Sequence, residues 1–450
     1  MNTKKILADY DKKYIWHPFT QMEDWCKNDP LIIDRGEGNY LIDIDGNKYL
    51  DGVSSLWVNV HGHNHPAINE AITEQLHKIS HTTFLGLTHP LAIELAKKLV
   101  EITPEKLSRV FYSDNGSTAV EAGLKIVYQY MQQSGNKKKN KFISFVNAYH
   151  GDTVGSVSVG GIDIFHKSYG SLLFETYKVP YPYCYRCPLG LKYPDCKIEC
   201  LNYLETCLEE KGDEIAGVVI EPRVQGAAGM LMAPEGHLKR VEDLCRKYEV
   251  FLIVDEVATG FGRTGKMFAC ELEGVQPDVM SVAKGITGGY LPLAATITSE
   301  EIYEGFLGDS SKTFFHGHSY TANPLGCAAA LASLDLFEKT NLVEKIQTRI
   351  KLLEKELNEK ILLLPNVGDI RQTGYMVGIE LVKNKKIKEP FEGNARMGHR
   401  VIMEARKHGV IIRPLGDVIV LMPPLSITEC EIFTLVSVVK DCIIKIFDKT

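Results

Sequence analysis

The chain has 450 residues, of which 44% are hydrophobic and 24% are charged, and its formal net charge is −6. This composition is typical of a globular protein with a large core, and a mildly acidic chain gives no electrostatic reason to expect nucleic acid or an anionic membrane as a partner. We find no apolar run of signal-peptide or membrane-spanning length. We therefore expect a cytoplasmic protein that acts on small molecules and keeps most of its cysteines reduced.

The first sixty residues contain hairpin signals. Residues 31–51 read LIIDRGEGNYLIDIDGNKYLD, in which alternating apolar positions are separated by Gly-Asn and Asp-Gly pairs. Such pairs are typical of tight turns between antiparallel strands. We expect residues 1–60 to join a smaller domain formed by the end of the chain, or to cross a subunit interface.

From residue 61 to about residue 330, short apolar runs alternate with helical patterns. Strands are predicted at RVFYS, KFISF, AGVVI, VFLIVD, PDVMSV and AATITS, and helices follow the first run and cover residues 237–248 and 324–339. Continuous apolar strands that alternate with helices predict an α/β domain with a mostly parallel sheet covered on both faces. Ligands of such sheets bind beyond the carboxyl ends of the strands, so the polar residues that end the strands are the first candidates for a site.

After about residue 331 the pattern changes. A long charged helix is predicted over residues 333–360, followed by short strands within residues 367–382 and 409–424 and by a last helix. Residues 331–450 are therefore expected to form a smaller α+β domain beside the large domain of residues 61–330.

The glycine-rich segment GFGRTG, residues 260–265, has the spacing of a dinucleotide-binding loop. Asp255 and Glu256 end the strand before it, and their carboxylates would repel a pyrophosphate. No small-residue helix follows the loop. The segment is thus a weak indication of a nicotinamide cofactor.

Four other strand ends carry chemically useful side chains. Gly116 and Ser117 begin a helix, and its first turn is either only capped or also binds an anion. Tyr149 either belongs to a polar turn or packs against a flat ring. Asp255 binds either a loop amide or a ligand cation. Lys284 is either a surface lysine or a desolvated amine that can form an imine. Taken together, a phosphate site, a ring face, a carboxylate for a pyridinium nitrogen and an imine-forming lysine describe pyridoxal 5′-phosphate.

The segment DEVATGFGRTGKMFACELEGVQPDVMSVAKG, residues 255–285, resembles the signature of the class III, fold-type I aminotransferases, and the resemblance covers nearly the whole chain. Within the family, WHPFTQM, DGVSSLWVNVHGHNHP, SHTTFLGLTHP, HGHSYTANPLGCAAA and IIRPLGDVIVLMPP are most similar to the members that convert 8-amino-7-oxononanoate to 7,8-diaminononanoate in biotin biosynthesis. The resemblance implies a pyridoxal-phosphate-dependent transferase, a homodimer with active sites at the subunit interface, and ping-pong kinetics through a Schiff base on Lys284.

The resemblance also implies roles for individual residues. Lys284 is expected to carry the cofactor and move the proton, Asp255 to hold the pyridine nitrogen protonated, and Glu221 to support that end of the ring. Tyr149 and Val257 are expected on the two ring faces. Gly116 and Ser117, with Ser319 of the partner subunit, are expected to hold the phosphate. The substrate-binding residues implied are Trp57, Phe19, Leu56, Gly317, His318 and Arg413, of which Arg413 would pair with the substrate carboxylate.

Three of these positions differ from the pattern associated with S-adenosylmethionine as the amino donor. Phe19, Leu56 and His318 stand where the pattern has Tyr, Trp and Pro. The donor end of the pocket thereby loses a hydroxyl and an indole, which favours L-lysine over S-adenosylmethionine. Other interpretations are a broader ω-amino-acid transaminase and a non-catalytic regulator that binds the cofactor. The regulator would need a DNA-binding extension, and the sequence contains no helix-turn-helix pattern.

A cysteine-rich segment, YCYRCPLGLKYPDCKIEC, contains Cys184, Cys187, Cys196 and Cys200. Four thiols in a short loop could bind Zn²⁺, although their inner spacing is shorter than in ordinary zinc ribbons. The chemistry of the family that the chain resembles needs no metal. The alternative is a cysteine-rich surface loop with a labile disulfide, and we expect no metal in the active site.

Overall fold

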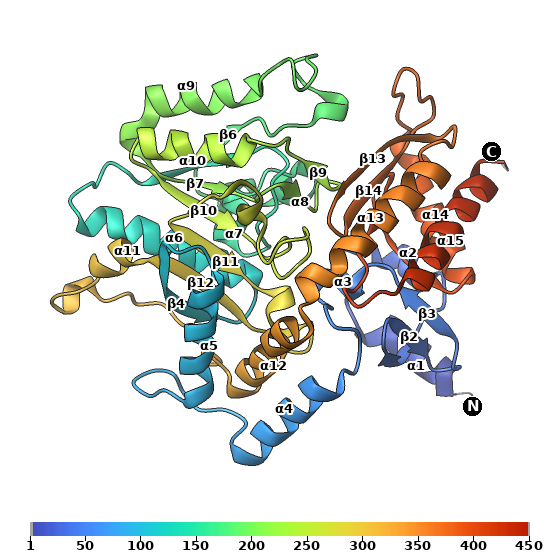
Figure 1. The fold of residues 1–450 in the computed structure, drawn as a ribbon, viewed down its shortest axis with the longest axis horizontal. Helices are drawn as coiled ribbons and strands as arrows, with labels where there is room; N and C mark the ends of the chain where they lie inside the picture. The colour runs from blue at the N-terminus through green and yellow to red at the C-terminus, as the bar shows by residue number, and fades with distance from the viewer. Residues whose placement is uncertain (1–2, 449–450) are drawn as a thin grey trace.

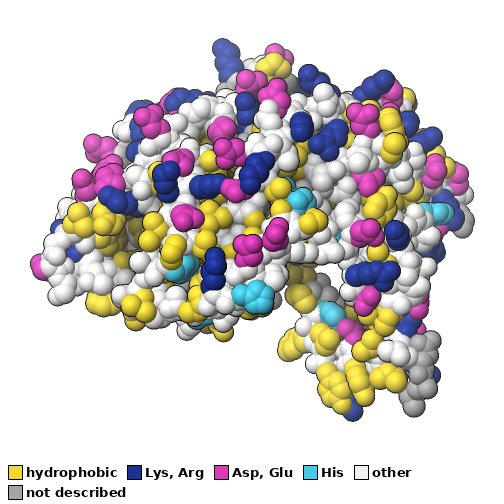
Figure 2. Space-filling view, turned by 60° about the horizontal axis from the view of Figure 1, so that its bottom comes forward, with side chains coloured by type: hydrophobic (Ala, Val, Ile, Leu, Met, Phe, Trp, Pro, Cys, Tyr) yellow, Lys and Arg dark blue, Asp and Glu magenta, His cyan; other side chains and the backbone are white. Residues whose placement is uncertain are grey.

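The computed structural model describes residues 3–448. Figure 1 shows a large body on one side and, on the other, a smaller body in which the first and last parts of the chain lie together. None of the helices in residues 3–448 is long and apolar enough to cross a membrane. Figure 2 shows positive and negative side chains interspersed over one face, and hydrophobic side chains gathered along its lower edge and on the lobe beneath it.

The large body is built around a seven-stranded sheet. Its order is β4 (Leu107–Ser113), β12 (Ala294–Ser299), β11 (Val279–Val282), β10 (Phe251–Asp255), β7 (Ile215–Ile220), β5 (Lys141–Phe145) and β6 (Tyr177–Val179). The pairs from β11 to β6 are parallel, and only β12 runs antiparallel to its neighbours. The predicted fold class, α/β with a mostly parallel sheet, is confirmed.

Both faces of this sheet are covered, which explains why central strands such as β7 and β10 are buried along their whole length. Ile253 of β10 packs into a cluster with residues of α6 (Gly116–Gln133), whereas its neighbours Leu252 and Val254 pack with residues of α5 (Pro90–Ile102) and α10 (His237–Lys247). Successive side chains of a strand point to opposite faces, so an uninterrupted apolar run serves two cores.

The carboxyl-terminal part contains an antiparallel sheet of β13 (Val367–Thr373), β14 (Met376–Leu381), β17 (Val418–Leu421) and β16 (Arg413–Leu415). Helices α13 (Leu342–Lys360), α14 (Met397–Lys407) and α15 (Glu429–Phe447) pack on one another and on this sheet. The amino-terminal strands β1 (Ile33–Glu37), β2 (Tyr40–Asp43) and β3 (Lys48–Asp51) form a second sheet with β15 (Val410–Ile411), which pairs with β3 in parallel. The first strands are thus hydrogen-bonded to the end of the chain, while the division at residues 60 and 330 stays a prediction.

The prediction of one helix over residues 333–360 is wrong. Helix α12 (Pro324–Thr340) ends one residue before Asn341, whose φ of 47° is left-handed, and α13 begins at Leu342. Asparagine tolerates this conformation better than most residues, and it commonly follows the end of a helix. Apolar spacing continues across the break, which is why the pattern conceals it.

The remaining elements are short or peripheral. The helices are α1 (Thr3–Tyr14), α2 (Met22–Cys26), α3 (Ser54–Trp57), α4 (Pro66–Lys78), α7 (Val154–Val159), α8 (Asp163–His166), α9 (Asn202–Lys211) and α11 (Glu300–Glu304). Strands β8 (Val224–Gln225) and β9 (Leu231–Met232) form a small hairpin. Single 3₁₀ turns occur in the connections, including one at Lys284–Thr287.

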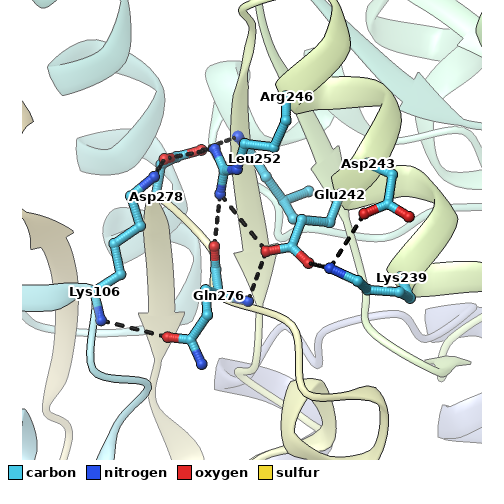
Figure 3. A network of polar contacts seen from close by, with 8 residues as sticks. All are labelled: Lys106, Lys239, Glu242, Asp243, Arg246, Leu252, Gln276 and Asp278. Atoms are coloured by element: carbon cyan, nitrogen blue, oxygen red, sulfur yellow. Dashed lines mark hydrogen bonds and ion pairs between the residues drawn. The ribbon is translucent and has the colours of Figure 1, made fainter.

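A polar network secures the sheet at the end opposite the polar strand ends (Figure 3). Asp278, just before β11, accepts hydrogen bonds from Arg246 Nη1 at 2.7 Å and from the N–H of Leu252 at 2.7 Å, and it also pairs with Lys106. Its side chain is fully buried. The network ties α10, β10 and the chain before β4 to one carboxylate.

Candidate active site

A cavity of about 520 Å³ lies at the carboxyl ends of the parallel strands. Its lining includes Asp255 at the end of β10, Glu221 after β7, Tyr149 after β5 and Lys284 after β11. These residues are far apart in the sequence and meet because the ends of parallel strands share one edge of the sheet. The cavity therefore lies where the sequence predicts a ligand site, beyond the carboxyl ends of the strands.

Asp255 is held by two donors. Its Oδ1 accepts the N–H of Val257 at 3.0 Å, and its Oδ2 lies 2.8 Å from Nδ1 of His150. Both Asp255 and His150 are buried. A carboxylate fixed in this way can present a stable negative charge to a cationic group of a ligand.

Lys284 has a φ of 47°, in the left-handed region. Burial lowers the pKa of Lys284 from its ordinary value, against the opposing effect of the Asp255 and Glu221 carboxylates. Its Nζ lies 5.0 Å from the ring centroid of Trp57. A lowered pKa increases the fraction of neutral amine, which is the nucleophilic form.

Glu221 is buried beside them. Its two carboxylate oxygens accept the backbone N–H groups of Tyr149 and Gly226, each at 3.0 Å. Burial raises the pKa of Glu221 to about 8, and the negative charge of Asp255 adds to that rise. Burial of Glu221 therefore favours the neutral form of its carboxyl group.

The amino-terminal end of α6 forms an anion-sized recess. Asn115 and Thr118 cap each other reciprocally, with Thr118 N donating to Asn115 Oδ1 at 3.1 Å, so the N–H groups of Gly116 and Ser117 remain for a ligand. A Cβ at Gly116 would lie 2.6 Å from Cγ1 of Val257. The helix end and Val257 can approach this closely only because residue 116 is glycine.

Aromatic and aliphatic side chains form the rest of the wall. Tyr149 donates its hydroxyl to Asp152 Oδ2 at 2.7 Å, and burial raises its pKa above the ordinary value. Phe165 of α8 lies between Tyr149 and Phe19, with ring centroids 6.1 and 5.4 Å away. Leu56 and Trp57 also line the cavity.

Arg413, the first residue of β16, supplies a cation to this wall. Burial lowers the pKa of Arg413, against the opposing effect of the Tyr149 hydroxyl. In residues 3–448 no carboxylate pairs with its guanidinium, whereas Arg371 and Arg246 each bind an acidic side chain. An unpaired arginine in a cavity is suited to bind a ligand carboxylate in a bidentate manner.

Three predicted site residues lie elsewhere. Gly317, His318 and Ser319 are absent from the cavity lining formed by residues 3–448. His318 comes closest, with its Nδ1 3.6 Å from Oδ2 of Asp114, which does line the cavity. The described chain thus brings together the predicted residues from the strand ends, β16 and the amino-terminal segment, but not those of residues 317–319.

Two cavity features were missed from the sequence. His150 belongs to the same strand-end motif as Tyr149, AYHGDT, but its pairing with Asp255 was not predicted. Phe165 lies on the short helix α8 between two loops, and no periodicity or motif marks it. Hydrophobic spacing identifies strands and long helices, but it does not show which loop side chain turns toward a cavity.

The cysteine-rich segment forms its own small cavity away from this site. Cys184, Cys187, Cys196 and Cys200 all line it, and burial together with the other thiols raises the pKa of Cys200 to about 11. In residues 3–448 no three His, Cys, Asp or Glu side chains are arranged to hold a metal ion, and all four cysteines are free thiols. The geometry gives the zinc interpretation no support.

The large cavity fits pyridoxal 5′-phosphate. The recess at Gly116 and Ser117 suits its phosphate, and the Asp255 carboxylate suits its ring nitrogen. Tyr149 and Val257 line the space between these groups, and Lys284 offers an amine to an aldehyde.

Comparisons with known proteins agree with this arrangement. The chain matches the model of the class-III aminotransferases over residues 22–443. It is similar to the adenosylmethionine-8-amino-7-oxononanoate aminotransferases of Nitratidesulfovibrio vulgaris (56% identity, 98% of this chain and 82% of the relative) and Geobacter sulfurreducens (54%, 96% of each). A crystal structure of the enzyme so named from Methanocaldococcus jannaschii has a TM-score of 0.94 at 49% identity and covers 98% of this chain and 99% of its own.

Proposed function

We propose a specific transamination for this chain, from the premise that it belongs to the class-III aminotransferase family. The amino acceptor is 8-amino-7-oxononanoate and the product is 7,8-diaminononanoate, a step of biotin biosynthesis. The observation that carries the acceptor is the unpaired Arg413 in a cavity with aliphatic and aromatic walls. It matches a substrate whose carboxylate lies at the end of a long apolar chain. The names of relatives at 49–56% identity support the same acceptor.

The chain is a pyridoxal-phosphate-dependent aminotransferase. When bound, this cofactor takes an amino group from a donor and gives it to a keto acceptor, so the two substrates occupy one cavity in turn. All other chemistry comes from the protein's own residues. They bind the cofactor, orient the substrate and move a proton.

In this proposal Lys284 is the proton-transfer residue. Its amine, whose pKa is lowered by burial, takes and returns a proton at the substrate carbon that bears nitrogen. Asp255, held by His150 and the N–H of Val257, keeps the ring nitrogen protonated. Gly116 and Ser117 hold the phosphate and Tyr149 and Val257 flank the ring. Glu221 supports the wall through the N–H groups of Tyr149 and Gly226.

The donor in the proposal is S-adenosylmethionine, which the names of the relatives specify. The preference for L-lysine that the sequence suggests finds no support in those names. It is kept as a second candidate because Phe19 and Leu56 both line the cavity and present apolar surface there. The cytoplasmic location of the protein stays a prediction from the sequence.

The proposal includes a homodimer in which Ser319 of the partner subunit completes the phosphate site. Large apolar side chains at Leu85, Phe315 and Trp16 are 91%, 83% and 87% exposed in the single chain, which favours their burial against a second copy. The hydrophobic edge in Figure 2 is of the same character.

Subunit complementation tests the dimer. Lys284→Ala and Ser319→Asp proteins, each inactive alone, are unfolded and refolded together. If Ser319 serves the other subunit's site, mixed dimers contain one intact site and activity returns. If it serves its own site, every mixed dimer has two damaged sites and no activity returns.

Absorbance spectroscopy tests the reaction. The visible band of the bound cofactor should bleach when the donor is added and return when 8-amino-7-oxononanoate follows. S-adenosylmethionine and L-lysine are compared in the first step, and shorter ω-amino acids test for a broader transaminase. Lys284→Ala should abolish turnover, whereas Lys178→Ala is a control lysine outside the cavity. A band that fails to return with 8-amino-7-oxononanoate would disprove the proposed acceptor.

A further inference from the structure

Part of the cavity wall is formed by α3, residues 54–57, whose backbone is a strained turn and not a regular helix. Ser54, Ser55 and Trp57 have φ values of 52°, 62° and 67°, in the left-handed region that non-glycine residues rarely adopt. Leu56 between them and Trp57 both line the cavity. Backbone strain of this kind persists only where surrounding groups hold it, and it is concentrated at functional sites.

A single carboxylate holds this turn. Asp51 ends β3 and its side chain has no exposure. Its Oδ1 accepts the N–H groups of Val53 at 3.3 Å and Ser55 at 2.9 Å, and its Oδ2 accepts the hydroxyl of Ser55 at 3.0 Å. Oδ2 also lies 2.9 Å from Nε2 of His63. Asp51 therefore uses its full accepting capacity on the turn and one histidine.

A further set of hydrogen bonds fixes the orientation of His63. The Asn59 amide lies 3.0 Å from Nδ1 of His63, so the amide donates to Nδ1 and Nε2–H donates to Asp51. The carbonyl of Asn59 accepts a hydrogen bond from Arg263, a fully buried residue. On the other side, Ser54 donates its hydroxyl to the carbonyl of Met422 at 2.6 Å. The turn is thus bound on both sides by groups outside the cavity.

The position of the turn affects both ends of the cavity. Asp51 pairs with Ile411 in the parallel ladder of β3 and β15, two residues before Arg413. Trp57 reaches the opposite end, where its ring lies 5.0 Å from Lys284 Nζ and against Gly226. A shift of this turn would therefore move Trp57 relative to Lys284 and disturb the strand pairing next to Arg413.

We propose that Asp51 is a positioning residue that selects for a long aliphatic acceptor. Its carboxylate fixes the strained turn of residues 54–57, so that Leu56 and Trp57 form one apolar floor between Lys284 and Arg413. The identity of the acceptor rests on the proposed function. The holding of Trp57 by Asp51 does not.

The test replaces one carboxylate oxygen by an NH₂ group in Asp51→Asn. An asparagine amide cannot accept four hydrogen bonds, and its NH₂ faces donors. The matched control is Asp43→Asn. Asp43 is also a buried aspartate of this sheet, and it accepts bonds from Asp45 N, Asn47 and Tyr49 in the hairpin between β2 and β3, outside the cavity.

The first measurement is ¹⁹F NMR of the holoenzyme labelled with 5-fluorotryptophan. The sequence has three tryptophans, and Trp57→Phe assigns the resonance of interest. In Asp51→Asn the Trp57 resonance should shift and broaden, while those of Trp16 and Trp25 stay. In Asp43→Asn all three should stay. An unchanged Trp57 resonance in Asp51→Asn overturns the proposal, whether or not the proposed reaction is correct.

The second measurement is kinetic. Asp51→Asn should raise KM for 8-amino-7-oxononanoate by about tenfold with a smaller change in donor KM, and Asp43→Asn should change neither by more than about twofold. Equal losses for donor and acceptor would overturn the selectivity part. If Asp51→Asn does not fold, His63→Gln, which disturbs one of the four bonds, should produce the same effects at smaller size. The absence of both effects in that variant would also overturn the proposal.

Discussion

The pairing of His150 with Asp255 gives a buried carboxylate a fixed direction. His150→Ala should lower kcat by roughly tenfold, since the loss of one hydrogen bond to a charged group weakens an interaction of about 1.5–3 kcal/mol. The pH profile of kcat and the visible band of the bound cofactor should shift as well, because the charge near the ring nitrogen changes. His150→Asn, whose amide can donate from the Nδ1 position, should recover part of the loss. An unaltered pH profile in His150→Ala would contradict this role.

Arg413 has no carboxylate partner among the residues described, so its full positive charge is available to the carboxylate of a bound substrate. Arg413→Met should raise KM for the acceptor by about 100-fold, as expected for losing a charge-assisted pair of about 2–3 kcal/mol, with little change in kcat. Arg413→Lys should give a smaller increase, because lysine keeps the charge but not the bidentate geometry. Steady-state kinetics at fixed donor concentration measure this. A large fall in kcat at unchanged KM would contradict it.

Lys178, which lies outside the cavity, should make the stability of the protein depend on pH. Although part of the Lys178 side chain is exposed, its Nζ donates to Ser144 Oγ and the carbonyl of Ser158, and desolvation of this amine lowers its pKa to about 7. The unfolded chain keeps the usual value of about 10.4, so between these values the unfolded state binds more protons. The contribution of Lys178 to stability therefore rises with pH across this window, and as pH falls it decreases from about 10.4 until it levels off below about 7. Melting temperatures from pH 6 to pH 10 should improve relative to Lys178→Met as pH rises. Parallel curves would contradict this.

At the scale of elements, the close packing of the start of α6 against Val257 requires that residue 116 has no Cβ. Gly116→Ala would place a Cβ 2.6 Å from Val257 Cγ1 and push the helix end from its partner. We expect at least a tenfold weaker affinity for the cofactor, measured by equilibrium dialysis, with the melting temperature of the cofactor-free protein nearly unchanged. The double variant Gly116→Ala/Val257→Ala should recover affinity. Gly212→Ala, where a Cβ meets no atom within 4 Å, is the neutral control.

The elements differ in how well the sequence predicts them. Strand β10 is buried on both faces, so its apolar run identifies it, and Asp255 at its end marks the site. The break at Asn341 is invisible to that method, because hydrophobic spacing continues while one residue takes a left-handed conformation. Phe165 is set by the path of a loop. Ser319 is expected at the site of a second chain only through the family resemblance, because hydrophobic spacing cannot show which residues cross a subunit interface.

At the scale of the whole molecule, the two ends of the parallel strands differ. The carboxyl ends line the cavity, and the opposite ends are held by the Asp278 network of Figure 3. Asp278→Ala leaves Lys106, Arg246 and the N–H of Leu252 without their acceptor, and should cost about 3–5 kcal/mol of unfolding free energy. Urea denaturation measures this. Asp243→Ala, which breaks an exposed pair with Lys239 in the same network, should cost at most about 1 kcal/mol. Equal costs would contradict the distinction.

The pairing of β3 with β15 has a consequence for biosynthesis. Asp51 meets its partner Ile411 only after the intervening chain has left the ribosome, which takes roughly 20–70 s at ~5–20 residues per second. The residues from Tyr149 to Lys284 are made well before that moment. During translation Lys284 and Asp255, the proposed catalytic residues, can therefore be folded while the turn of residues 54–57 still lacks its supporting strand. The nascent chain should acquire its cofactor site before it acquires its selectivity.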